Sequence, residues 1–405
     1  MVGFLFSAET RRNPYPWYEQ MRQASPVFCD PGTGTWMLFD YASVRAVMND
    51  QETFSSRVVP PGGRAPDWLV FNDPPRHSLL RAAVMRAFTP RAIAELEPRI
   101  RQISADLLAA ASTTGEMDLI ADYATPLPTL VIAEMMGIPS VDRERFAMWS
   151  QAIVNLSYSM MGGAEAQRTT MEFYAVRPEM HAYVMALVAE RRAQPGSDLL
   201  STIIQSNVDG QRLTEDDVFG FFLLLLSAAT ETTTNLIGNA VVTLLEHPDQ
   251  LQLLRERREL LPGAIEEIVR FRSPGQVMFR QTTRDVQMHG RVIPANSFVL
   301  VMVGSANRDT SHIADAGQFL IARSPNPHIA FGHGIHFCLG AALARLEGRI
   351  ALTHLLDEFS TIELADETPW EPRQALHVHG PARLPIRLAA DRGRRRIQCS
   401  VSTNE

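Results

Sequence analysis

The chain has 405 residues, and all 38 of its Lys and Arg positions are arginine. The absence of lysine excludes pyridoxal-phosphate enzymes, Schiff-base aldolases, Walker-A nucleotide sites and protein kinases, because each needs a lysine amine. A net charge of −7 argues against nucleic-acid binding through a general basic field. Cys29, Cys338 and Cys399 are an odd set, far apart in sequence, and do not form a disulfide framework, which favours a reducing compartment.

The N-terminal residues lack the pattern of a secretory signal. The longest apolar run, residues 218–229, falls short of the ~20 residues that a membrane span requires. We therefore expect a soluble, cytoplasmic and monomeric protein without a membrane anchor.

Helical periodicity dominates the first half of the chain. A loop rich in proline and glycine is expected at residues 57–72, and loops of this length within a domain are usually functional. The expected elements around it are a helix at 15–24, strands at 27–29 and 35–39, and helices at 42–48, 76–88, 92–111 and 123–136.

The longest expected helix covers residues 214–247. Thr214 can cap its first turn, and His247 followed by Pro248 ends it. A helix of this length extends for ~50 Å at 1.5 Å per residue, enough to cross the whole molecule. Its middle is apolar nearly all round, which predicts a buried helix.

Most strand signal comes late, with short strands expected within residues 277–300 and a closing hairpin within 374–388. The sequence predicts a mainly α protein with a minor β part. We expect one catalytic domain over residues 1–390 and a disordered tail over 391–405.

Cys338 stands just ahead of a helix that begins at Ala341, after a glycine-containing turn. Backbone N–H groups and the helix dipole at such a position stabilise a thiolate. One alternative is a small buried core cysteine. Another is a zinc site with His333 and His336, which lacks a second cysteine pair.

The ten residues that begin at Phe331 match the pattern F-x-x-G-x-H-x-C-x-G, so the chain resembles the cytochrome P-450 family. The resemblance implies the P-450 fold, with a long buried helix over a haem b. It implies that Cys338 binds the iron and that Phe331, Gly332, Gly340 and Ala228 lie against the cofactor.

Glu267 and Arg270 resemble the family's E-x-x-R motif. A pair at i, i+3 on a helix is ordinarily a surface pair. The resemblance instead implies a buried structural network completed by Arg323.

Four residues resemble the family's partners of the haem propionates: His77, Arg81, Arg280 and His336. His77 and Arg81 are four residues apart and share a helix face. The forked guanidinium of arginine suits a carboxylate. For His77 alone, a helix-surface position is the competing interpretation.

The stretch from Ser227 to Asn235 resembles the family's oxygen-activation motif. A carboxylate and hydroxyls within a buried apolar helix break a local rule, and such sites are often functional. The resemblance implies that Glu231 relays protons and that Thr232 hydrogen-bonds dioxygen. Ala229 replaces the family's usual glycine.

The activity implied is hydroxylation or epoxidation of a medium-sized apolar molecule with O₂ and two electrons from a separate ferredoxin or flavodoxin. A basic docking patch for that donor would comprise Arg81, Arg86, Arg91, Arg345 and Arg349. A peroxide-driven peroxygenase and a haem-thiolate sensor without turnover are the alternatives, and the pair of Glu231 and Thr232 argues against both.

The resemblance also indicates a mostly apolar substrate pocket, with His377 as a further polar candidate. Its expected lining is Leu69, Val70, Phe71, Leu224, Ala228, Gln276, Val277, Met278 and Val378.

Overall fold

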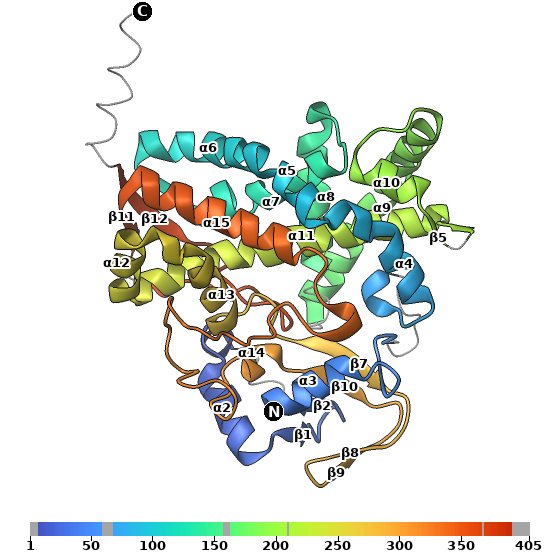
Figure 1. Ribbon diagram of the computed structural model, residues 1–405, viewed down its shortest axis with the longest axis vertical. Helices are drawn as coiled ribbons and strands as arrows, with labels where there is room; N and C mark the ends of the chain where they lie inside the picture. The colour runs from blue at the N-terminus through green and yellow to red at the C-terminus, as the bar shows by residue number, and fades with distance from the viewer. Residues whose placement is uncertain (1–6, 59–67, 157–162, 209, 367, 391–405) are drawn as a thin grey trace, which may run out of the picture.

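The computed structural model describes residues 7–58, 68–156, 163–208, 210–366 and 368–390. Helices dominate it, and most of them gather on one side of a smaller β region (Figure 1). The α-helices are α1 Ala8–Arg12, α2 Tyr15–Ala24, α3 Tyr41–Asn49, α4 Arg76–Met85, α5 Pro90–Glu95, α6 Glu97–Thr114, α7 Pro126–Met135, α8 Arg143–Asn155, α9 Gly163–Ala193, α10 Leu199–Gln205, α11 Glu215–Glu246, α12 Pro248–Glu256, α13 Leu261–Phe271, α14 Val303–Ala306 and α15 Ala341–Glu358. The strands are β1 Val27–Cys29, β2 Trp36–Leu38, β3 Phe54–Ser55, β4 Glu116–Asp118, β5 Asn207–Val208, β6 Gln211–Arg212, β7 Met278–Thr282, β8 Val286–Met288, β9 Arg291–Ile293, β10 Phe298–Val301, β11 Phe359–Leu364 and β12 Pro385–Ala390.

Helix α11 runs through the middle of the molecule, packed against α7, α8, α13 and α15 (Figure 1). A capping box starts it, because the Thr214 side chain accepts the N–H of Asp217 and the Asp217 carboxylate accepts the N–H of Thr214. His247 ends it. The predicted helix is confirmed. By length and composition α11 could cross a membrane, but 78% of its apolar window is buried inside the protein, as in a core helix.

A five-stranded sheet joins the start of the chain to its second half, in the order β1-β2-β10-β7-β3. The parallel pairing of β2 with β10 makes this connection. A second sheet has the order β11-β12-β4. The predicted hairpin within residues 374–388 is wrong: β12 pairs with β11 and β4, while Val378 and Pro381 form only isolated bridges to Gly275 and Pro372.

Two helical predictions need correction, and one long helix was not predicted. The helix expected at 92–111 is divided at Leu96 into α5 and α6, with a proline in the first turn of α6. The one expected at 123–136 begins instead with a π-helical segment, Leu119–Ala124. Helix α9 was not predicted, since Pro178 inside it masks the pattern. The tail 391–405 and residues 59–67 of the predicted loop lie outside the described residues.

Candidate active site

The middle of helix α11 is buried except for one short stretch that is accessible to solvent. Residues 221–226 and 233–244 are all buried, whereas Ala228 is exposed and Ser227 and Thr232 are partly so. Small and hydroxyl-bearing side chains on an otherwise buried helix indicate an internal space beside it. The sequence motif therefore coincides with the one stretch of the helix middle that a ligand can reach.

The acidic and hydroxyl groups of this stretch have defined partners. Thr232 Oγ1 donates a 2.7 Å hydrogen bond to the Ala228 carbonyl, one turn back. Ala229, at the family's usual glycine position, lies inside a continuous α-helix. The buried Glu231 carboxylate lies 3.8 Å from Nε2 of His377. His377, expected only as a polar pocket residue, is thus a neighbour of the acid.

A cavity of about 580 Å³ lies on another side of α11, and Glu231 forms part of its wall. Thr230, also on the wall, lies 3.3 Å from Ser150 and 3.5 Å from Thr129 through their hydroxyl oxygens. Successive residues of an α-helix are ~100° apart. On the surface of α11, Glu231 therefore lies between two sides of the helix. Thr230 marks the side that faces the cavity, and Thr232 marks the side that is accessible at Ala228.

The loop before α15 presents Cys338. The Cys338 N–H donates to the Phe331 carbonyl at 2.8 Å, which closes the loop. Gly332 and Gly334 have φ values of 78° and 70°, which favour glycine. A Cβ on Gly334 would lie 2.6 Å from the Met48 carbonyl oxygen, so close packing requires glycine there as well.

The Cys338 thiol is exposed, yet protein surrounds it closely, and this desolvation raises its pKa. The Gly340 N–H and the guanidinium groups of Arg345 and Arg81 act in the opposite direction. Within the described part of the chain, no group of three His, Cys, Asp or Glu side chains lies close enough together to hold a metal ion.

Two arginines and two histidines from three parts of the chain come together beside this loop. His77 and Arg81 lie on α4, Arg280 on β7 and His336 on the loop. The rings of His77 and His336 are 4.4 Å apart. Arg81 donates to the carbonyl of Phe337 at 2.8 Å, and Arg280 donates to that of its neighbour on β7 at 2.7 Å.

The electrostatics of this cluster show an excess of positive charge. Burial lowers the pKa of Arg280 to about 10, with only Asp73 acting against it. The pKa of His336 falls to about 3 through burial and the charges of Arg280, His77 and Arg81. Nε2 of His77 is buried without a hydrogen bond to the described residues. A bound anion would relieve this repulsion.

Sequence reasoning missed two polar neighbours of the cluster. Ser56 Oγ lies 2.8 Å from Nε2 of His336. The Asp73 carboxylate accepts the N–H of Ser56 at 2.9 Å. Both residues flank the long predicted loop, and only the tertiary fold brings them to the loop of Cys338.

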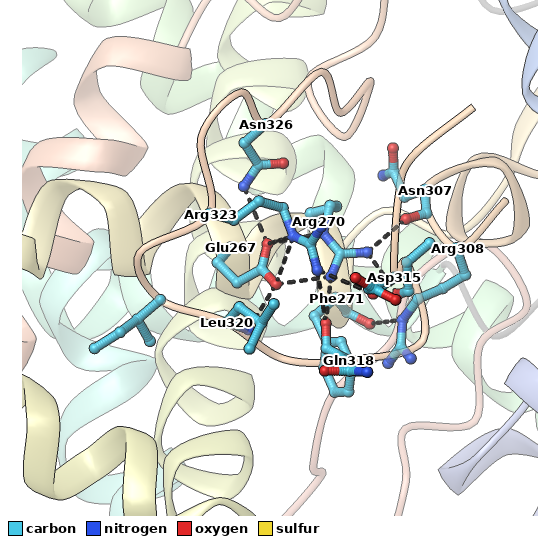
Figure 2. A network of polar contacts seen from close by, with 12 residues as sticks. Glu267, Arg270, Phe271, Asn307, Arg308, Asp315, Gln318, Leu320, Arg323 and Asn326 are labelled. Carbon is cyan, nitrogen blue, oxygen red and sulfur yellow. Dashed lines mark hydrogen bonds and ion pairs between the residues drawn. The ribbon is translucent and has the colours of Figure 1, made fainter. Parts of the chain in front are cut away.

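Glu267, Arg270 and Arg323 form a saturated buried network (Figure 2). Arg270 binds the Glu267 carboxylate through two hydrogen bonds of 2.8 and 2.7 Å. Its remaining N–H groups donate to the carbonyls of Asn307, Ala316 and Gln318 at 2.8–2.9 Å.

Arg323 adds two bonds to the same carboxylate, at 3.0 and 3.1 Å. Asn326 donates a further one, and the backbone N–H of Leu320 donates at 2.9 Å (Figure 2). Leu320 stands where the family often has an aspartate, and here its backbone supplies the contact. The network fixes the segment that leads to the Cys338 loop.

The structure brings together only some of the residues that were expected to line the substrate pocket. Leu69 and Leu224 are buried in the main core, and Val70 is 42% exposed. The prediction that Gln276 and Val378 line the substrate pocket needs correction, because both line a different, small cavity near α1 and α2. Gln276 donates to Ser273 O and Tyr15 Oη.

The remaining lining residues lie in different surroundings. Val277 packs with Tyr15 in a minor core, and Phe71 is half-buried. Met278 Cε would lie 3.3 Å from a Cβ on Gly332, so Met278 borders the Cys338 loop.

The predicted basic patch also needs correction at two positions. Arg345 makes two hydrogen bonds with Glu266, at 2.7 and 2.8 Å, and lies 4.2 Å from the Phe331 ring. Arg91 pairs with Glu95 on an exposed helix turn. Each of the two already has a carboxylate partner within the protein.

A model of the family described as Cytochrome P450 matches residues 1–383. The chain belongs to the cytochrome P450 family. The putative cytochrome P450 YjiB of Bacillus subtilis is 40% identical over 360 residues, covering 89% of this chain and 90% of that protein. Vitamin D(3) 25-hydroxylase of Pseudonocardia autotrophica is 38% identical over 399 residues, covering 95% and 96%.

Solved structures agree with this assignment. CYP109E1 from Bacillus megaterium in complex with testosterone has a TM-score of 0.86 and 36% identity, covering 94% of this chain and 99% of that chain. The predicted fold class, with its long buried helix, is confirmed. This P450 is a monooxygenase, an oxidoreductase of a family of haem enzymes that use O₂ and a redox partner.

Proposed function

We propose that this P450 binds haem b through Cys338 as the iron ligand. The exposed thiol supports this, because coordination to a cation would overcome the burial that raises its pKa. When bound, the haem supplies oxygen activation and oxidation of the substrate. Gly332, Gly340 and Phe331 would lie against it, as would Ala228 of α11.

The unbalanced cluster of His77, Arg81, Arg280 and His336 is the observation that carries the proposal. Burial lowers the pKa of all four groups, and the neighbouring guanidinium groups lower the pKa of the two histidines further. Such a set fits two carboxylates, the charge that a haem b brings. His77 Nε2, buried and without a partner among the described residues, fits the same role.

We infer that Glu231 and Thr232 deliver and hold protons. The cavity beside Thr230 supplies a hydroxyl-lined approach to Glu231, and Thr232 continues it toward Ala228. Nε2 of His377 lies 3.8 Å from the Glu231 carboxylate and would pair with it when the ring is protonated. These contacts favour a monooxygenase over a peroxide-driven enzyme, which needs no such relay.

Glu231→Gln tests this role, with Glu144→Gln, also on the cavity wall, as the matched control. Losing a proton relay should lower kcat by about 10²-fold and enlarge the solvent isotope effect. The control should stay within about twofold of the parent enzyme. Unchanged kcat and isotope effect in Glu231→Gln would show that protons take another route.

The substrate is proposed to be a medium-sized apolar molecule, such as a terpenoid, steroid, fatty acid or polyketide. The accessible Ala228 and the partly buried, apolar Met278 support this class. Relatives that act on vitamin D(3) and bind testosterone are consistent with it. A screen for the spectral shift caused by water displacement, followed by product analysis, tests it; binding confined to polar compounds would contradict it.

We further propose that an acidic ferredoxin or flavodoxin donates the electrons to a monomeric, cytoplasmic enzyme. Arg81, Arg86 and Arg349 remain candidates for its docking. Of these, Arg81 donates to the carbonyl of Phe337, which is 43% exposed. Turnover should then fall as ionic strength rises. Turnover that is independent of salt would argue against charge-guided docking.

A further inference from the structure

We propose that a second cavity binds a phosphate-bearing anion through Arg12, Arg22, Arg272 and Arg308. The cavity has a volume of about 600 Å³ and shares no lining residue with the candidate active site. It lies where the start of α2, the ends of α11 and α13, and Trp370 meet. The proposal is independent of the proposed haem and proton-relay roles.

The charge of the lining favours an anion. Four guanidinium groups face the carboxylates of Glu19 and Glu246, which leaves an excess of two positive charges. Glu246 is already bound by Arg272 at 2.7 Å, so it opposes an incoming anion less than a free carboxylate would.

Arg308 is the least balanced of the four. Its guanidinium lies 3.2 Å from the Phe271 ring centroid and 4.1 Å from that of Tyr15. Nε donates to the Phe271 carbonyl at 2.7 Å, and the residue is only 9% exposed. It forms no ion pair with any carboxylate in the described part of the chain. Burial lowers its pKa to about 9, whereas an anion would restore it.

Arg272 carries unused donors. Its side chain is 9% exposed, and Nη2 is occupied by Glu246. Nε and Nη1 are buried and make no hydrogen bond with the described residues. Buried donors without partners are costly, and in native proteins they usually have a water or ligand partner.

Arg12 and Arg22 are held in place by hydrogen bonds to distant parts of the chain. Nε of Arg12 donates to Trp370 O at 2.7 Å. Nη1 of Arg22 donates to the carbonyl and hydroxyl of Ser305, each at 2.9 Å. One nitrogen of each guanidinium is fixed while other N–H groups remain, and this lowers the conformational entropy lost on binding. Forks from separate elements suit the several oxygens of a phosphate group.

The probe is pyrophosphate, titrated calorimetrically into the holoenzyme at constant ionic strength. One saturable site per chain is expected. Arg12→Gln and Arg22→Gln should each weaken binding about tenfold. Arg168→Gln, an exposed arginine on α9, is the matched control and should bind as the parent does.

Glu19→Gln provides a test that structural damage cannot imitate, because removing a repelling carboxylate should tighten binding by about threefold. The proposal is overturned if the holoenzyme shows no saturable binding. It is also overturned if the Arg12 and Arg22 variants bind like the Arg168 control, or if Glu19→Gln fails to bind more tightly.

Discussion

Arg270 and Arg280 are both buried arginines of this P450, but their charges are balanced differently. Arg270 meets the Glu267 carboxylate and three backbone carbonyls, so its N–H groups are satisfied within the protein. Arg280 donates to one carbonyl and stands among His77, Arg81 and His336. A buried charge whose N–H groups all have partners within the protein links the segments of the fold. A buried cluster whose positive charges lack such partners is suited to bind an anion.

The Cys338→Ala variant tests how far the unbalanced cluster alone can hold the haem, and it has the largest expected effect. We expect complete loss of monooxygenase activity and of the red-shifted carbon monoxide band of the reduced protein, because the thiolate is gone. Cys29→Ala, at the other described free cysteine, should keep both. A retained red-shifted band in Cys338→Ala would refute the ligand assignment.

Glu267→Gln tests the saturated network. It should lower the free energy of unfolding in urea by about 3–5 kcal/mol, because Arg270 and Arg323 would lose their buried counter-charge. The adjacent Glu266→Gln removes a partly exposed partner of Arg345 and should cost about 1 kcal/mol. Equal losses of unfolding free energy in the two variants would mean that the buried network contributes no more than a partly exposed ion pair.

Glu347 on α15 extends the comparison to a buried acid that has no ion-pair partner among the described residues and no expected ligand. Burial raises its pKa from 4.5 to about 8, and Oε2 has no hydrogen bond with the described residues. Between these two pH values the unfolded chain releases a proton that the folded protein keeps. Stability from this residue is therefore present below pH 4.5 and lost as pH rises through 8.

The slope of this loss should approach about 1.4 kcal/mol per pH unit. Glu347→Gln should remove it, while the exposed Glu95→Gln should leave it unchanged. Unfolding free energies measured in urea from pH 5 to pH 8 give the comparison. Parallel curves for Glu347→Gln and the parent enzyme would contradict the assignment.

Arg280→Gln tests the unbalanced cluster directly, with the smallest expected effect. Removing one of four carboxylate partners should speed transfer of haem to a globin acceptor about tenfold. Arg284→Gln, an exposed arginine just beyond β7, is the control and should not change the rate. Slower or unchanged transfer in Arg280→Gln would place the haem carboxylates elsewhere.

The parts of the site that lie close together in sequence were predictable. The turn and cysteine around Cys338 and the capped ends of α11 depend on local spacing, and both were recognised. Helix α9 was missed because Pro178 interrupts its pattern, and the hairpin at 374–388 was wrong because β12 pairs with distant strands.

The sequence by itself determined the family, the buried central helix and the residue types at the candidate site, because these follow from motifs and apolar periodicity. Only the tertiary structure decided which charges are balanced. It satisfied Arg270 with carbonyls from another segment, left Arg280 beside two histidines, and brought Arg12 and Arg308 to one cavity. Charge balance depends on distances between segments far apart in the chain, and local patterns do not encode them.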